Sequence, residues 1–173
     1  SRALRNLNHA MPDLDDAEKD QILRAMWHNL GRVVGEYPHI NSIVDKGWVE
    51  FVGLDHLKAL DGGGFLIGAH IGNWEFGPFA ALSTGKKVAA IYRPLNNPLL
   101  SGLLHRRQET YGGDIYRKGR EAALGMVTAL RKGQMMCLLV DQQLREGVSV
   151  PFFGHSARTS ISHIKIAVTK QVP

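Results

Sequence analysis

The segment that says most about this chain is Phe65-Leu-Ile-Gly-Ala-His70-Ile-Gly-Asn-Trp-Glu75. A short apolar run, typical of a buried strand, ends at a histidine, and a turn containing glycine follows. A carboxylate arrives five positions after the histidine, where a helix is expected to begin. Because ligands bind outside the carboxyl ends of the strands in open α/β sheets, the segment predicts a strand that delivers His70 to a site.

The rest of the chain repeats this alternation of short apolar runs and helical patterns. We expect strands at residues 49–52, 65–69, 88–92, 114–116 and 135–140, and helices at 54–60, 74–83, 98–111, 119–132 and 160–170. Strands that alternate with helices are typical of βαβ units. The pattern therefore predicts an α/β fold with a mainly parallel central sheet flanked by helices.

A long amphipathic helix is expected before this region. An acidic cluster at residues 13–20 suits the positive end of a helix dipole, and Gly35 and Pro38 supply the end of the helix. Apolar residues recur between them at helical spacing: Ile22, Leu23, Met26, Leu30, Val33 and Val34. We expect this helix to pack on the core, with Met26 and Trp27 as packing residues.

The composition is that of a globular protein with a core of its own. The chain has 173 residues, of which 44% are hydrophobic and 21% charged. The single cysteine, Cys137, excludes an internal disulfide and thiolate zinc sites, and the scattered histidines predict no metal site. The apolar runs are far shorter than the roughly 18 residues that span a bilayer.

The positive charge is concentrated in one part of the sequence. Ten lysines and arginines but three acidic residues lie between Lys86 and Lys132, whereas the whole chain has a net charge of +5. A localised basic segment favours an anionic partner, which leaves nucleic acid, phosphorylated lipid, a membrane surface or an acidic protein. The alternative is a solvated charged face.

Two motifs that would point to other chemistry are incomplete. The segment Gly154-His-Ser156-Ala-Arg158 lacks the second glycine of a nucleophile elbow, which disfavours a serine hydrolase. The segment 83–87 has Lys87 where a P-loop needs Ser or Thr, and Ala80 stands in place of the first glycine. A histidine with a carboxylate on its second nitrogen is instead the usual form of a general base, so His70 and Glu75 are the candidate dyad.

The segment His70–Glu75 resembles the HxxxxD/E motif of the glycerolipid acyltransferase superfamily, in the form found in bacterial lipid A biosynthesis (lauroyl/myristoyl) acyltransferases. Three further blocks are similar to that family in order and spacing: 91–100, 117–119, and 140–143 together with 150–154 and Thr159. The resemblance implies a glycerolipid-acyltransferase-like fold. It also implies that residues 1–173 form a single acyltransferase domain, a fragment without the family's N-terminal membrane anchor and C-terminal part.

The resemblance also implies roles for individual residues. His70 removes the proton from a lipid hydroxyl that attacks an acyl thioester, and Glu75 orients His70, so that no covalent nucleophile and no cofactor is needed. The groups expected to bind substrate or stabilise the oxyanion are Asn73, Arg93, Arg106, Arg107 and Asp141, with Arg106 and Arg107 as alternatives for one position. Asp141 also ends an expected strand, at the same edge of the sheet as His70. For Phe152 and Phe153 core packing is favoured over an acyl-chain groove.

The function implied is transfer of a fatty acyl chain from acyl carrier protein to a hydroxyl of a lipid A precursor. The expected partners are acyl carrier protein, the anionic glycolipid acceptor and the inner-membrane surface, with no nucleic acid. The full-length protein is expected at the cytoplasmic face of the inner membrane, and the fragment by itself is expected to be soluble. The alternatives are a basic module that binds membrane or nucleic acid, an acyltransferase for another glycolipid or phospholipid, and an inactive fragment.

Overall fold

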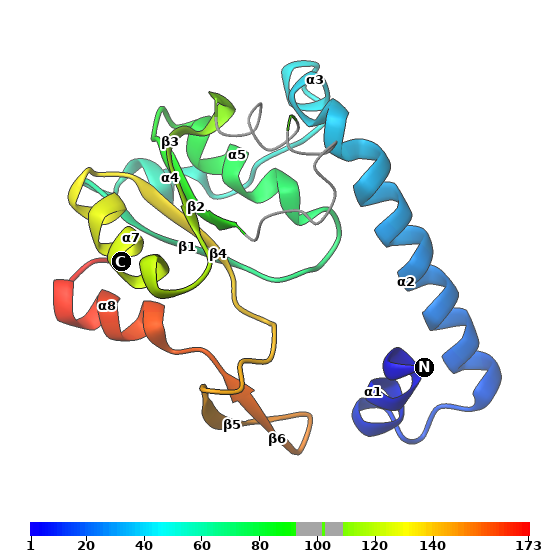
Figure 1. Ribbon diagram of the computed structural model, residues 1–173. Coiled ribbons are helices and arrows are strands. Elements are labelled where there is room, and N and C mark those ends of the chain that lie inside the picture. The colour runs from blue at the N-terminus through cyan, green and yellow to red at the C-terminus, as the bar shows by residue number, and fades with distance from the viewer. Residues whose placement is uncertain (93–101, 103–108) are drawn as a thin grey trace.

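The computed structural model describes residues 1–92, 102 and 109–173, and its centre is a four-stranded parallel sheet (Figure 1). The strands are β1 (Gly64–Gly68), β2 (Val88–Tyr92), β3 (Gly112–Arg117) and β4 (Met135–Leu139). Their order is β1-β4-β2-β3, so β4 lies between β1 and β2. The predicted α/β class with a mainly parallel sheet is confirmed, and four of the five expected strands are present.

The prediction of a fifth strand, at residues 49–52, is wrong. These residues lie in irregular backbone, and Val52 is 89% exposed. Gly53 follows with a left-handed φ of 79° and begins α4 (Leu54–Lys58) at once. The apolar run is therefore a short connection on the surface. Its sequence pattern is the same as that of a buried strand, so periodicity does not separate the two.

Helices cover both faces of the sheet. The helices α4 and α5 (Gly77–Leu82) lie on one face, and α7 (Arg120–Arg131) and α8 (Ser162–Lys170) lie on the other (Figure 1). Successive residues of each strand point to opposite faces and so divide the core into two clusters. The first is centred on Ala81, Val88, Tyr111 and Met135, and the second on Ala89, Met126, Ala129 and Met136.

The expected N-terminal helix is present as α2 (Asp16–Glu36). Asp15 caps it by accepting from the Glu18 backbone N–H, and the Glu18 carboxylate accepts from the Asp15 N–H in return. The helix runs outward from the sheet, with the short α1 (Arg2–Ala10) beside its far end (Figure 1). The expectation that Met26 and Trp27 pack on the core is wrong, because both are exposed, Trp27 by 62%.

The chain returns to the sheet from α2 through short elements. A 3₁₀ turn, η1 (Tyr37–His39), and α3 (Ile40–Asp45) follow the helix directly. Ile40, the first residue of α3, is almost fully buried.

A two-stranded hairpin that sequence patterns did not indicate stands below the sheet. It consists of β5 (Val148–Phe152) and β6 (His155–Thr159), paired antiparallel (Figure 1). Its two turn residues, Phe153 and Gly154, both have positive φ, as the tightest hairpin turns require. Phe152 and Phe153 are exposed at the tip, so the expectation that they pack in the core is wrong. The His155 ring contacts α1 by donating to the His9 carbonyl at 3.2 Å.

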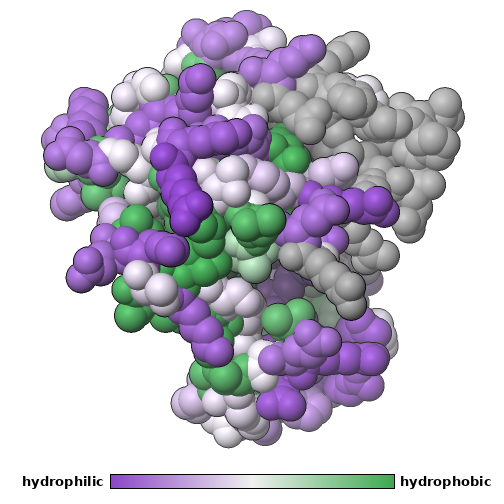
Figure 2. Space-filling view, turned by 60° about the vertical axis from the view of Figure 1, so that its left-hand side comes forward, coloured by the Kyte–Doolittle hydropathy of each residue, from purple (hydrophilic) through white to green (hydrophobic). Residues whose placement is uncertain are grey.

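Apolar side chains remain uncovered on the outer side of the second helical layer. Figure 2 shows them gathered near the middle of the face on which α7 and α8 lie. The exposed large hydrophobic residues of these two helices are Leu124, Ile164 and Val168. The inner side of α7 supplies the core residues Met126 and Ala129, and Ile166 of α8 packs against the same cluster.

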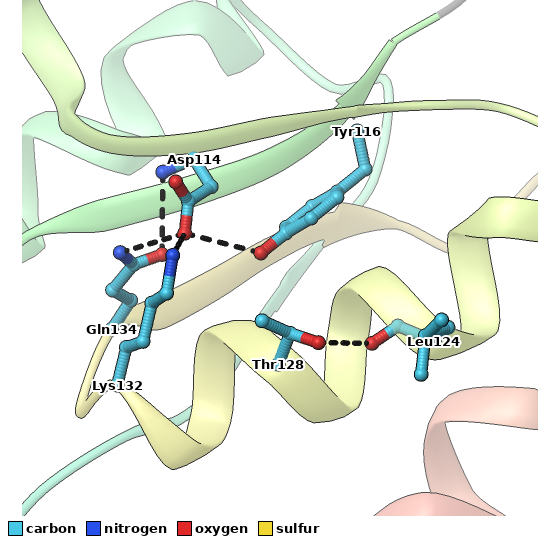
Figure 3. A network of polar contacts seen from close by, with 6 residues as sticks. All are labelled: Asp114, Tyr116, Leu124, Thr128, Lys132 and Gln134. Carbon is cyan, nitrogen blue, oxygen red and sulfur yellow. Dashed lines mark hydrogen bonds and ion pairs between the residues drawn. The ribbon is translucent and has the colours of Figure 1, made fainter.

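A polar cluster at the amino-terminal edge of the sheet ties β3, β4 and α7 together (Figure 3). The Asp114 carboxylate accepts from Lys132 Nζ at 2.8 Å, Gln134 Nε2 at 3.1 Å and the Tyr116 hydroxyl at 3.1 Å. The hydrogen bond from Lys132 is the main reason that the pKa of Asp114 lies below its usual value. This cluster is structural, because its donors come from β3 itself, from the end of α7 and from the residue before β4.

A buried histidine on α8 makes folding stability depend on pH. Burial beneath the Phe65 ring, at 6.3 Å between centroids, lowers the pKa of His163 below its ordinary value of 6.5. The unfolded chain therefore binds a proton at this site more readily than the folded chain. We expect the free energy of unfolding to fall as the pH drops below about 6.5.

Urea unfolding at about pH 7.5 and about pH 5.5 checks this expectation. The loss of stability between the two pH values is expected to be smaller in His163→Leu than in the unmodified chain. His28→Leu serves as the control, because His28 is exposed on α2. Equal losses in His163→Leu and the unmodified chain would contradict the assignment.

Candidate active site

The carboxyl ends of β1 and β4 bring His70 and Asp141 together. The two strands pair in the register Gly64↔Met135 to Gly68↔Leu139, and the Val140 N–H continues the ladder by donating to the Gly68 carbonyl at 3.1 Å. His70 lies two residues after Gly68, and Asp141 lies two residues after Leu139. The predicted placement of both residues at one edge of the sheet is therefore confirmed.

Asp141 holds His70 by two hydrogen bonds. Its Oδ1 lies 2.7 Å from the ring Nδ1, and its Oδ2 accepts from the His70 backbone N–H at 2.9 Å. A carboxylate accepts only, so Nδ1 carries the proton and the neutral ring has its lone pair on Nε2. The two side chains are 31% and 37% exposed. The arrangement is that of an oriented general base that solvent and substrate can reach.

Asp141 is ionised in this arrangement. Partial burial, the largest single influence, raises the pKa of Asp141, but the hydrogen bonds from the His70 backbone and ring together outweigh it. The pKa therefore lies below its ordinary value. A negative charge beside Nδ1 stabilises the imidazolium that forms when Nε2 takes a proton.

Two further side chains surround the ring, and neither was predicted from the sequence. The amide Nε2 of Gln142 lies 3.4 Å from the His70 Nε2. The Trp74 ring meets the His70 ring edge to face, with 4.9 Å between centroids. Only their positions in the sequence could have indicated them. Gln142 directly follows Asp141, and Trp74 lies within the His70–Glu75 motif.

The loop after His70 is fixed by a glycine and by α2. Gly72 has a left-handed φ of 58°, and its carbonyl accepts from Asn29 Nδ2 at 3.0 Å. The Asn73 Oδ1 accepts from the Glu75 N–H at 3.1 Å, and its Nδ2 donates to Glu36 at 2.7 Å. Both ends of the Asn73 amide are thus used within the protein, which favours holding the loop over the substrate contact expected from the sequence.

The carboxylate on the second ring nitrogen of His70 is that of Asp141, where sequence reasoning expected Glu75. Glu75 lies in the 3₁₀ turn η2 (Trp74–Phe76), and its role as the orienting acid stays a prediction. Likewise, Asp141 was expected to bind substrate or stabilise the oxyanion, but its carboxylate faces His70. The strand order explains the difference, because it makes residue 141 a neighbour of residue 70 across the sheet.

The remaining expected site residues are the arginines Arg93, Arg106 and Arg107. All three lie outside the described residues, and their roles stay predictions. Two basic residues that are described lie at the same edge as His70: Arg117, which ends β3, and Lys118, which follows it. The Lys118 N–H donates to the Tyr92 carbonyl at 2.8 Å, which places the end of β3 beside the end of β2.

Cys137 is the one thiol of the chain, and it lies within β4. Burial raises its pKa to about 12. The thiol is therefore protonated at neutral pH and is a poor nucleophile. Within residues 1–92, 102 and 109–173, no three His, Cys, Asp or Glu side chains are grouped as a metal ion would need. Across those same residues, every helix is too short or too polar to cross a bilayer.

Comparison with known proteins identifies the family of the chain. The profile of the bacterial lipid A biosynthesis acyltransferase family matches residues 1–172. A lipid A biosynthesis acyltransferase of Haemophilus influenzae is 29% identical over 157 residues, which are 87% of this chain and 50% of that protein. The chain thus spans about half the length of this curated relative. By its family profile, the chain belongs to the bacterial lipid A biosynthesis acyltransferases.

Proposed function

We propose that this chain carries the acyl-transfer site of a lipid A biosynthesis acyltransferase, which moves a fatty acyl chain from acyl carrier protein to a hydroxyl of a lipid A precursor. The observation that carries the proposal is the hydrogen-bonded pair of His70 and Asp141 at the carboxyl edge of the sheet. The Haemophilus influenzae relative is named for this biosynthesis.

The proposed reaction needs one base and no acyl-enzyme intermediate. The acceptor hydroxyl gives its proton to His70 Nε2 while its oxygen attacks the thioester carbonyl carbon. Asp141 stabilises the imidazolium through Nδ1. The tetrahedral intermediate then collapses, the carbon–sulfur bond breaks, and the leaving thiolate takes the proton back from Nε2. The products are an ester and a free carrier thiol.

The surroundings of His70 suit an amphiphilic substrate. Three apolar side chains from β1, the loop after it and β4 are exposed around this edge: Ile67, Ile71 and Leu139. They offer an acyl chain apolar contact beside the base. Arg117 and Lys118 are exposed at the end of β3 and offer cationic contacts to an anionic head group.

The charge distribution supports the same partners. The segment with ten basic and three acidic residues, from Lys86 to Lys132, includes the end of β3. Acyl carrier protein is acidic and the acceptor carries phosphates, so both are attracted to a positive surface. For the full-length protein we propose the cytoplasmic face of the inner membrane as the place of reaction.

The test is an assay of the purified chain with acyl carrier proteins that carry different acyl lengths and a tetra-acylated lipid A precursor. Ester product is expected only when donor and acceptor are both present, and mass spectrometry measures it. A phospholipid acceptor and another glycolipid acceptor are run in parallel. Folded protein that gives no ester with any pair, but binds anionic vesicles with a steep salt dependence, would support the basic binding module instead.

A further inference from the structure

Gln142 occupies the reactive side of His70. Asp141 takes up Nδ1, so chemistry at this histidine must proceed at Nε2, and the Gln142 amide nitrogen lies 3.4 Å from that atom. Gln142 is exposed and directly follows Asp141 in the chain. Because both carboxylate oxygens of Asp141 are bonded to His70, the backbone at residue 142 is fixed relative to the base.

The contact between Gln142 and the ring is weak in the free protein. A separation of 3.4 Å is longer than the usual 2.7–3.2 Å of a hydrogen bond from nitrogen. The amide can therefore turn its N–H to another acceptor at little cost. A substrate oxygen that takes the place of His70 Nε2 as the partner of the Gln142 amide accepts a hydrogen bond from a donor that is already positioned.

The position matches a need of the proposed reaction. The acceptor oxygen hydrogen-bonds to Nε2 before the attack and becomes bonded to the carbonyl carbon during it. The oxyanion is attached to that same carbon, so it lies close to Nε2. A donor 3.4 Å from Nε2 is within hydrogen-bonding reach of the oxyanion.

We propose that the Gln142 side-chain amide is a catalytic hydrogen-bond donor that stabilises the oxyanion of the tetrahedral intermediate. This inference rests on the proposed function. No proton leaves the amide: the hydroxyl proton moves to His70 Nε2 and then to the departing thiolate, and Gln142 only donates a hydrogen bond. A neutral donor at this position does not repel the imidazolium, as a cation would.

Kinetics of Gln142→Ala test the inference. Loss of one oxyanion donor is expected to lower kcat by about 10²- to 10³-fold with little change in KM, because the bond forms mainly in the transition state. Gln142→Glu replaces the donor by an anion and is expected to be at least as impaired. The matched control is Gln143→Ala, the same substitution at the next residue, which is also exposed. A kcat of Gln142→Ala within twofold of the control, or a loss confined to KM, would overturn the inference.

A second measurement separates this inference from the proposed function. If the unmodified chain forms no ester, the proposed function fails, and nitrogen NMR of the His70 ring then decides on Gln142. Gln142→Ala is expected to shift the Nε2 resonance and to leave the Nδ1 resonance, bonded to Asp141, in place. An unchanged Nε2 resonance would show that the amide does not reach the reactive nitrogen and would reject its role.

Discussion

His70→Ala is expected to lower kcat for acyl transfer by about 10²- to 10⁴-fold, the range associated with a positioned general base. The residual rate would come from substrate binding and from donors to the oxyanion. The fold is expected to persist, because the His70 ring lies at the surface edge of the sheet and is 31% exposed. The measurement is steady-state ester formation, with circular dichroism and the thermal midpoint as tests of folding.

Added imidazole supplies a control for this variant. Alanine leaves space where the ring stood, and a free base that enters it is expected to restore part of the rate. His28→Ala, which removes an exposed histidine from α2, is expected to keep full activity. Retention of more than about a tenth of kcat in His70→Ala would mean that another group is the base.

Asp141→Asn is expected to have the second largest effect. The amide has nearly the shape of the carboxylate, but it has no charge to stabilise the imidazolium. The ring Nδ1 and the backbone N–H of His70 both donate to residue 141. The amide NH₂ of asparagine is itself a donor, so it cannot accept from whichever of the two it faces. The ring must then change tautomer or turn. We expect kcat to fall by about 10²- to 10⁴-fold while KM changes little.

Two matched variants are compared with Asp141→Asn. Asp114→Asn removes a carboxylate from the opposite edge of the sheet and is expected to lower the thermal midpoint without changing kcat. Glu75→Gln tests the acid that the sequence motif suggested. If Glu75 orients the base, Glu75→Gln will lose at least as much kcat as Asp141→Asn. A larger loss in Asp141→Asn, with an altered pH profile of kcat, is expected if Asp141 does so.

The sheet was predictable because helices cover both of its faces, which makes its strands read as short apolar runs. Runs such as 65–69 and 135–140 are continuously apolar, and each is followed by a polar side chain at its carboxyl end. These two facts placed His70 and Asp141 at one edge before their contact was known. The order of the strands was not predictable, since it depends on contacts between distant segments. The identity of the acid beside Nδ1 depends on that order.

The wrong predictions of burial have one physical cause: apolar residues also occur on the protein surface. Periodicity indicates an apolar helix side but not its distance from the core, so Trp27 on the projecting α2 was misjudged. The same holds for Phe152 and Phe153, whose apolar character suggested burial although they form a hairpin tip. Gln142 was missed because an amide has no recognisable catalytic spacing and becomes informative only beside a base.

The central position of β4 has a consequence for how the protein is made. β4 is the last of the four described strands to leave the ribosome, yet it joins β1 to β2. Until it emerges, β1 has no partner strand in the sheet and must wait through about 70 residues of synthesis, at roughly 5–20 residues per second. The contacts that close the sheet are therefore distant in sequence and slow to form. The same late event brings Asp141 to His70, so a nascent chain has no oriented base before β4 has joined β1.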